Sequence, residues 1–322
     1  MFSRAMTEMT RMLVAFDGSE AAAGAIRAAA ALFPHMDAVV VCVRGKPLTA
    51  ELARGALPDS VIAGGPQEFE REAATRASAI AEHGSAIARA SALRAFAVVQ
   101  VASAPWRGLC AAAEEHAASI VVCGSRGQGG FSRAVLGSTS SSMLHHAPLP
   151  VLVVPAGAGA LDGPLLIGYD GSADARAAIA MTARLLPGRG VIVVHGWSSS
   201  ISRSFVGESL LTAPVAEIQE ITHDIDAVFA GQAADVAEAG AAFAREHGLA
   251  ARALAVEASP GAWRALSAAA RSERAALVVT GCRGRGALAS TVLGSVSAGL
   301  VHNADGPVLV VRPPRAGAEP DA

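Results

Sequence analysis

The same loop pattern occurs twice in the chain, and this internal repeat constrains the fold more than any other feature. Gly124-Ser125-Arg126-Gly127 is followed by nine residues and then by Gly137-Ser138. The pattern returns as Gly281-Cys282-Arg283-Gly284, nine residues and Gly294-Ser295, at an offset of 157 residues. Both copies follow a short β-branched run and precede a segment typical of a helix. The halves are therefore duplicates, and we predict two domains at residues 1–156 and 163–315.

Strand and helix signals alternate along each half. In the first half the pattern predicts strands at residues 12–16, 38–43, 96–102, 120–123 and 151–154, and helices at residues 20–32, 67–90, 105–116 and 138–145. The second half repeats this order over residues 165–311. Alternation of this kind predicts an α/β fold with two tandem, doubly wound, parallel five-stranded sheets. The continuous apolar strands fit sheets that are covered on both faces.

The last strand of each half, at residues 151–154 and 308–311, is wholly apolar. An open edge of this composition would favour aggregation. We therefore predict that the two edges pair within the chain, which makes the molecule a pseudo-twofold dimer of its halves. Independent domains on a linker are the alternative, and a further homodimer of whole chains stays open.

The glycine loops are candidate phosphate-binding sites. A strand, a glycine-rich loop and a helix start together offer backbone N–H groups to an anion, next to the positive end of the helix dipole. A tight turn with a capped helix would account for Ser138, but it leaves the two upstream glycines unexplained. Arg126 and Arg283 lie inside the loops. They could neutralise phosphate charge, or they could be ordinary surface residues.

An aspartate follows the first strand of each half. Asp17-Gly18-Ser19 and Asp170-Gly171-Ser172 are ordinary turn and N-cap sequences, which is one interpretation. The other is a carboxylate that accepts hydrogen bonds from a nucleoside. In doubly wound sheets, ligands bind at the carboxyl ends of the strands where the strand order reverses. The aspartates and the glycine loops both belong to that edge, so we expect one ligand crevice in each half.

Composition excludes several other functions. A net charge of −2 and a pI of about 6.5 give no electrostatic footprint for nucleic acid. The polar N-terminal residues and the lack of a long apolar run predict no signal peptide and no membrane span, hence a cytoplasmic protein. The four cysteines have no metal-binding spacing, and Lys46 is the only lysine, which removes P-loop and Schiff-base lysines.

The sequence resembles the tandem form of the universal stress protein family, and in particular its ATP-binding branch. The resemblance is carried by Gly-x-x-Gly, nine residues and Gly-Ser, and by Asp-Gly-Ser after the first strand. The resemblance covers nearly the whole chain and implies an adenine nucleotide alpha-hydrolase-like fold. It implies adenine contacts from Ala15, Asp17 and Val41 in the first half and from Gly168, Asp170 and Val193 in the second. Ribose and phosphate contacts are implied for Cys123, Gly124, Gly127, Gly137, Ser138 and Thr139, and for Thr280, Gly281, Gly284, Gly294, Ser295 and Val296.

These features predict a nucleotide-responsive module that binds ATP, or another adenine nucleotide, in each half. Hydrolysis should be slow at most, because no lysine and no obvious base serves the phosphates. A divalent ion such as Mg²⁺ is compatible with bound ATP, although the sequence names no protein ligand for it. The alternatives are an ATPase or nucleotidyl-transfer enzyme of the same fold class, a dimerisation scaffold without ligand, and a chain in which only one site is loaded.

Overall fold

The computed structural model describes residues 10–46, 65–127, 136–198, 215–284 and 293–313. It divides into two compact units, Met1–Ala158 and Gly159–Ala322, and each unit is described by itself. The N-terminal residues, the irregular stretch after the second strand and most of the C-terminal tail lie outside the described residues. The expected pairing between the last strands of the two halves stays a prediction.

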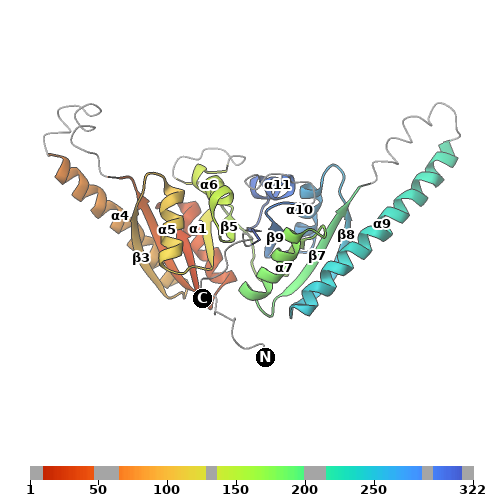
Figure 1. Ribbon diagram of the computed structural model, residues 1–322, viewed down its shortest axis with the longest axis horizontal. Coiled ribbons are helices and arrows are strands. Elements are labelled where there is room, and N and C mark those ends of the chain that lie inside the picture. The colour runs from red at the N-terminus through yellow and green to blue at the C-terminus, as the bar shows by residue number, and fades with distance from the viewer. Residues whose placement is uncertain (1–9, 47–64, 128–135, 199–214, 285–292, 314–322) are drawn as a thin grey trace, which may run out of the picture. The chain divides into compact units, whose positions relative to one another are not determined.

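Unit 1 contains five strands and four helices among its described residues, in the predicted alternation (Figure 1). They are β1 Arg11–Ala15, α1 Glu20–Leu32, β2 Asp37–Arg44, α4 Gly65–Ala90, β3 Ala95–Val101, α5 Pro105–Glu115, β4 Ile120–Gly124, α6 Ser138–His146 and β5 Val151–Val154.

Unit 2 repeats this order over its described residues. Its elements are β6 Leu165–Gly168, α7 Ala173–Leu185, β7 Gly190–Trp197, α9 Val215–Glu246, β8 Ala250–Glu257, α10 Ala262–Ser272, β9 Leu277–Gly281, α11 Ser295–Asn303 and β10 Val308–Val311.

The strands of unit 1 lie in the order β3-β2-β1-β4-β5, and all neighbouring pairs are parallel. Unit 2 has the equivalent order β8-β7-β6-β9-β10, again parallel throughout. In each unit the chain runs outward from the first strand on one side and then returns to its other side. The carboxyl ends of β1 and β4, and of β6 and β9, therefore flank the point where a doubly wound sheet binds ligands.

Helices cover both faces of each sheet. In unit 1, α1 packs against α4 on one face and α5 packs against α6 on the other. In unit 2 the corresponding pairs are α7 with α9 and α10 with α11. Figure 1 shows the long helix α9 running beside β8 and extending past the end of that strand. The central strands are consequently buried on both faces, as their uniform apolar composition predicts.

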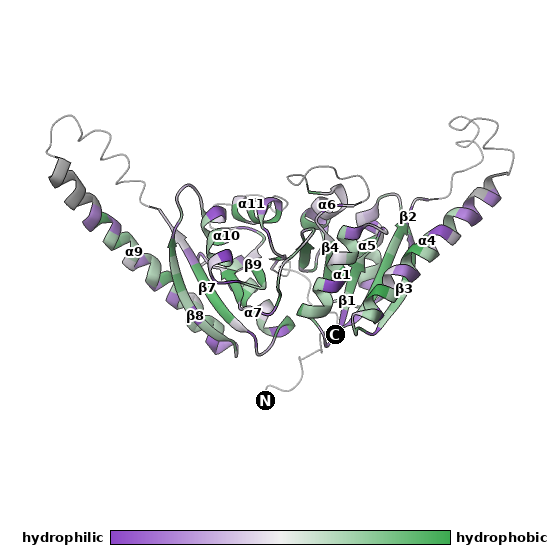
Figure 2. Cartoon of the chain, turned by 180° about the vertical axis from the view of Figure 1, so that it is seen from behind, coloured by the Kyte–Doolittle hydropathy of each residue, from purple (hydrophilic) through white to green (hydrophobic). Residues whose placement is uncertain are grey.

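The core of each unit lies between these layers. The central strands are hydrophobic along their length, whereas α4 and α9 alternate hydrophobic and hydrophilic residues (Figure 2). On the α4 side, Cys42 of β2 packs against Ala77 and Ala81. Small side chains at this contact let the helix approach the sheet closely. Among the described helices, none combines the length and the apolar character that crossing a membrane requires.

Candidate functional site

The aspartate after the first strand has one oxygen engaged in the local turn. In unit 1, Asp17 Oδ1 accepts a hydrogen bond from the Ser19 N–H (3.0 Å), and Ser19 Oγ accepts one from the Ala22 N–H (3.2 Å) and so caps α1. Unit 2 repeats both bonds at the same distances through Asp170, Ser172 and Ala175. The turn chemistry that the sequence suggested is therefore present in both halves.

The second carboxylate oxygen faces the glycine loop. A Cβ at Gly127 would lie 2.5 Å from Asp17 Oδ2, and a Cβ at Gly284 would lie 2.7 Å from Asp170 Oδ2. Real Cβ atoms do not approach an oxygen so closely, so a side chain here would require the carboxylate or the loop to shift. The two sequence signals, which lie more than a hundred residues apart, therefore meet at one edge of each sheet.

The first glycine of each loop serves the packing of the neighbouring helix. A Cβ at Gly124 would lie 2.9 Å from the carbonyl carbon of Ala21, and a Cβ at Gly281 would lie 2.8 Å from that of Asp174. These positions therefore need glycine because the end of β4 or β9 touches the backbone of the first turn of α1 or α7.

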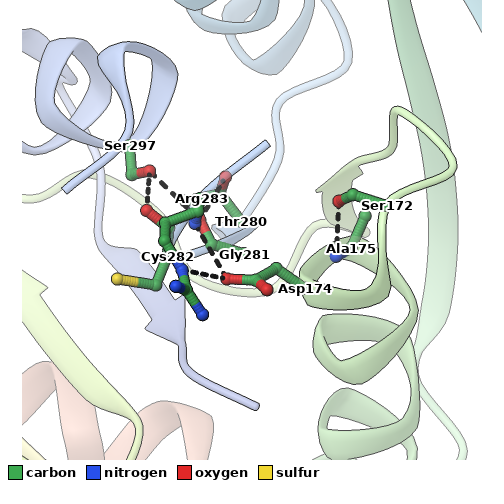
Figure 3. A network of polar contacts seen from close by, with 8 residues as sticks. All are labelled: Ser172, Asp174, Ala175, Thr280, Gly281, Cys282, Arg283 and Ser297. Carbon is green, nitrogen blue, oxygen red and sulfur yellow. Dashed lines mark hydrogen bonds and ion pairs between the residues drawn. The ribbon is translucent and has the colours of Figure 1, made fainter. Parts of the chain in front are cut away.

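Hydrogen bonds close the base of each loop. The Gly137 N–H donates to the Ser125 carbonyl (2.7 Å), and the Gly294 N–H donates to the Cys282 carbonyl (2.8 Å). A buried hydroxyl adds a second tie: Ser140 Oγ donates to the Gly124 carbonyl at 2.7 Å. Its counterpart Ser297 Oγ lies 3.1 Å from the Gly281 carbonyl oxygen and 3.0 Å from that of Cys282 (Figure 3). Sequence reasoning missed both serines, although they recur at the same offset of 157 residues.

Helices α6 and α11 begin at these loops without a side-chain cap. Their N-cap residues are Gly137 and Gly294, which have no side chain with which to cap the helix. By contrast, the serines before α1 and α7 cap those helices. The N–H groups in the first turns of α6 and α11 are therefore the donors that an anion would satisfy, beside the positive end of the helix dipole.

The loop of unit 2 has an additional acidic partner. Asp174, in the first turn of α7, accepts hydrogen bonds at Oδ2 from the Arg283 backbone N–H (3.0 Å) and from Arg283 Nε (3.3 Å). Figure 3 shows the carboxylate pointing from α7 toward the loop. The side chain of Asp174 is only 11% exposed, so solvent screens this ion pair weakly.

A cavity of about 510 Å³ opens where these elements meet in unit 2. Its lining includes Tyr169, Asp170 and Ala175, and Ala262 and Leu266 of α10 contribute apolar surface. Nine of the ten predicted residues of the second half line the cavity: Gly168, Asp170, Thr280, Gly281, Arg283, Gly284, Gly294, Ser295 and Val296.

The tenth residue, Val193, does not line the cavity. Its Cγ1 would lie 2.8 Å from a Cβ at Gly240, so the side chain points to the face that α9 covers. The neighbouring Val194 and His195 line the cavity instead. Strand pairing gives the same register, because Gly168 pairs with Val194 just as Ala15 pairs with Val41. Val194 is therefore the true counterpart of Val41.

In unit 1 the predicted residues occupy the equivalent places on the fold. Ala15 ends β1, and the carbonyl of Val41 accepts a hydrogen bond from the Phe16 N–H (2.9 Å). Burial and, next, the Asp17 carboxylate raise the pKa of the Cys42 thiol, which places the end of β2 near this aspartate. The remaining predicted residues lie at the end of β4, in the loop and at the start of α6: Cys123, Gly124, Arg126, Gly127, Gly137, Ser138 and Thr139.

The two units differ near the carboxyl end of their second strand, at His195 of β7. His195 Nδ1 lies 2.7 Å from the carbonyl oxygen of Tyr169 in unit 2, whereas unit 1 has Cys42 at the equivalent point of β2. Within the described part of the chain, no group of three or more His, Cys, Asp or Glu side chains is placed to hold a metal ion.

In each unit, five parallel strands of this order carry a glycine loop opposite an acidic turn, and this fold is that of a tandem α/β protein of the adenine nucleotide alpha-hydrolase-like class. Comparison with known proteins gives the family. The model of the universal stress protein family (Usp) matches residues 8–155 and again residues 163–312. The chain therefore belongs to the universal stress protein family and contains two Usp domains.

The relatives with similar sequences include universal stress proteins of mycobacteria. A universal stress protein of Mycolicibacterium smegmatis is 35% identical over 201 residues, and the match covers 61% of this chain and 62% of the relative. The chain thus matches less than two thirds of that protein's length. Among solved structures, a universal stress protein from Archaeoglobus fulgidus has a TM-score of 0.60 at 18% identity, with 95% of this chain and 99% of that chain covered. This likeness shows the fold.

Two other solved structures are described with ligands. One is a universal stress protein in complex with cAMP, and the other is a universal stress protein from Archaeoglobus fulgidus in complex with dAMP. They are 20% and 17% identical to this chain, with TM-scores of 0.32 and 0.30.

Proposed function

We propose that each unit binds one adenine nucleotide, with ATP as the leading candidate, and that the protein acts as a nucleotide-responsive module. The observation that carries this proposal is the uncapped start of α11, which opens into the cavity opposite Asp170. A helix N-terminus with unsatisfied N–H groups favours phosphate, and the carboxylate across the cavity favours the hydrogen-bond donors of a nucleoside.

The dimensions and lining of the cavity suit such a ligand. A volume of about 510 Å³ lies within the range of sites that take nucleotide-sized molecules. The wall formed by Leu266, Ala262 and Val194 is apolar and offers a surface for a base. The phosphate end would meet Gly284, Ser295 and Val296, whose backbones border the loop and the first turn of α11.

The equivalent groups of unit 1 support a second site of the same kind. The loop, the uncapped α6 and the contact between Asp17 and Gly127 repeat the geometry of unit 2. Adenine as the base, rather than another heterocycle, follows from the resemblance of both glycine motifs to the ATP-binding branch of the family.

The proposal includes that the bound nucleotide is hydrolysed slowly at most. The single lysine, Lys46, belongs to neither loop, and neither loop contains a histidine or carboxylate that could activate a water molecule. Binding with little turnover suits a module whose state follows the nucleotide concentration.

The experiment is to identify and then titrate the nucleotide. Protein purified without added nucleotide would be denatured, and the released small molecules separated and identified by mass spectrometry. Calorimetric titration of nucleotide-free protein with ATP, AMP, adenosine and GTP would follow. The proposal expects binding of adenine nucleotides, with adenosine and GTP clearly weaker. Absence of any binding at millimolar ATP would contradict it.

A further inference from the structure

The first turns of α1 and α7, which touch the two loops, differ at a position that carries a charge in unit 2 and none in unit 1. A Cβ at Gly124 would touch the backbone of Ala21, and a Cβ at Gly281 would touch the backbone of Asp174. Ala21 and Asp174 are therefore structurally equivalent residues in the first turns of α1 and α7. Unit 2 has a carboxylate where unit 1 has only a methyl group.

This carboxylate acts directly on the candidate phosphate loop. Asp174 Oδ2 holds both the backbone N–H and the Nε of Arg283, at 3.0 and 3.3 Å (Figure 3). The guanidinium that could meet a phosphate is therefore bonded to an acid of its own unit. Asp170 contacts the same loop at Gly284, so two carboxylates flank this loop in unit 2.

The charge of Asp174 should reach a bound phosphate tail. Its side chain is only 11% exposed, and Arg283, which it contacts, lines the cavity. Coulomb energies in a site of low effective dielectric are several times those in water and fall only with the first power of distance. A tail with more negative charge is therefore penalised more. The start of α7 stabilises the carboxylate charge itself.

We propose that Asp174 is a specificity-determining residue that shifts the unit 2 site toward nucleotides with fewer phosphate charges. Ala21 leaves unit 1 without this discrimination. The inference rests on the proposed nucleotide binding and adds that the two sites of one chain prefer different phosphorylation states. A chain with such a pair of sites would respond to the ratio of ATP to AMP as well as to the total nucleotide.

A second effect of Asp174 acts on a different quantity. By holding the Arg283 N–H, the carboxylate also fixes the loop, which should help every phosphate-bearing ligand alike. The ratio of AMP to ATP dissociation constants cancels this common contribution and retains the dependence on ligand charge. Arg312, a further cation near Cys282, is constant across all variants of unit 2 and cancels in the same way.

The test uses the full chain with one site blocked at a time. Gly127→Val blocks unit 1 and leaves unit 2 for measurement, and Gly284→Val does the reverse. In the first background, Asp174→Asn removes the charge but keeps an acceptor for the Arg283 N–H, and Asp174→Ala removes both. In the second background, Ala21→Asp places the carboxylate in unit 1. Circular dichroism and thermal melting verify that each variant is folded.

We expect both Asp174 variants to raise the preference of unit 2 for ATP over AMP by about tenfold, which corresponds to about 1.4 kcal/mol. Ala21→Asp should lower this preference in unit 1 by a similar factor, and added salt should shrink both effects. An unchanged ratio in folded Asp174→Asn would overturn the inference while leaving nucleotide binding intact. The inference would also be overturned if Asp174→Ala lost ATP and AMP affinity equally while Asp174→Asn lost neither. That result would indicate that Asp174 only positions the loop. Failure of the unmodified protein to bind any nucleotide would overturn the proposed function and this inference together.

Discussion

At the residue scale, the aspartate of each half does two things with its two oxygens. One oxygen completes the turn before α1 or α7, and the other lies against the glycine loop across the crevice. The turn interpretation and the ligand interpretation of Asp-Gly-Ser are therefore compatible. Under the proposed function, the second oxygen is the one assigned to the nucleoside.

Asp170→Asn separates these two roles. The amide keeps an oxygen for the Ser172 N–H but loses the charge, so the fold should persist while nucleotide affinity of unit 2 falls by about 1–3 kcal/mol. Adenosine affinity should fall as well, because the carboxylate is assigned to the nucleoside. Ser172→Ala is the control: it removes the cap of α7 and should cost about 1 kcal/mol of stability without changing the affinity. Equal affinities in Asp170→Asn and the unmodified protein, measured by calorimetry, would remove Asp170 from the site.

Cys123 gives a residue-scale prediction about pH. Burial raises the pKa of this thiol from its ordinary value of 9.0 to about 11, while a hydrogen bond with Ser140 acts in the opposite direction. The folded state therefore keeps a proton that the unfolded chain loses first. Stability should be unaffected below pH 9 and should decline from pH 9 to about pH 11.

Cys123→Thr supplies the matched comparison, because Thr280 stands at the same position of unit 2. The variant has no thiol at this position to titrate. Between pH 9 and pH 11 its free energy of unfolding should therefore fall less than that of the unmodified protein, and the difference should reach up to about 3 kcal/mol. Urea unfolding at pH 8, 9, 10 and 11 measures the difference. Parallel curves for the two proteins would show that the thiol titrates alike in the folded and unfolded states.

At the element scale, the loop geometry gives a physical reason for glycine that differs from the sequence expectation. The sequence suggested that a side chain at Gly127 or Gly284 would fill the phosphate volume. The structure shows that a Cβ there collides first with the aspartate across the crevice. A substitution would therefore disturb the aspartate as well as the loop.

Gly284→Ala tests this contact with the smallest possible change. A Cβ 2.7 Å from Asp170 Oδ2 forces the carboxylate or the loop to move, so nucleotide affinity of unit 2 should fall at least tenfold. Gly231→Ala in α9 is the matched control, because a Cβ at Gly231 meets nothing within 4 Å. This control should retain affinity and gain about 0.5–1 kcal/mol of stability from higher helix propensity. Full affinity in Gly284→Ala would show that the loop tolerates a side chain.

Much of the element pattern was predictable from the sequence, and the misses have identifiable causes. Helix bounds followed from alanine-rich periodicity and from the serine caps of α1 and α7. The register of β7 did not, because its apolar run from Val191 to Val194 shows no inward and outward alternation, and the residue that pairs with Gly168 is Val194 and not Val193. Asp174 was missed because its counterpart is alanine, so the repeat gives no signal there. Ser140 and Ser297 did repeat, but hydroxyls in a first helical turn look like ordinary capping residues.

At the scale of the whole molecule, the duplication is both the most predictable feature and the source of the functional question. Equal spacing of the two glycine motifs predicts equal sites, and the shared geometry of Asp17 with Gly127 and of Asp170 with Gly284 is consistent with that. The halves have nevertheless diverged where charge matters, at Ala21 and Asp174, and near the carboxyl ends of β2 and β7, at Cys42 and His195. Divergence of this kind favours two sites with distinct ligand preferences over two copies of one site.

The stoichiometry of nucleotide binding tests the central claim most directly. Calorimetric titration of the nucleotide-free chain with ATP should give two bound nucleotides per chain. Each of Gly127→Val and Gly284→Val should give one, and the double variant should give none while circular dichroism shows an unchanged fold. A folded double variant that still binds two nucleotides, or an unmodified chain that binds none at millimolar ATP, would contradict the account.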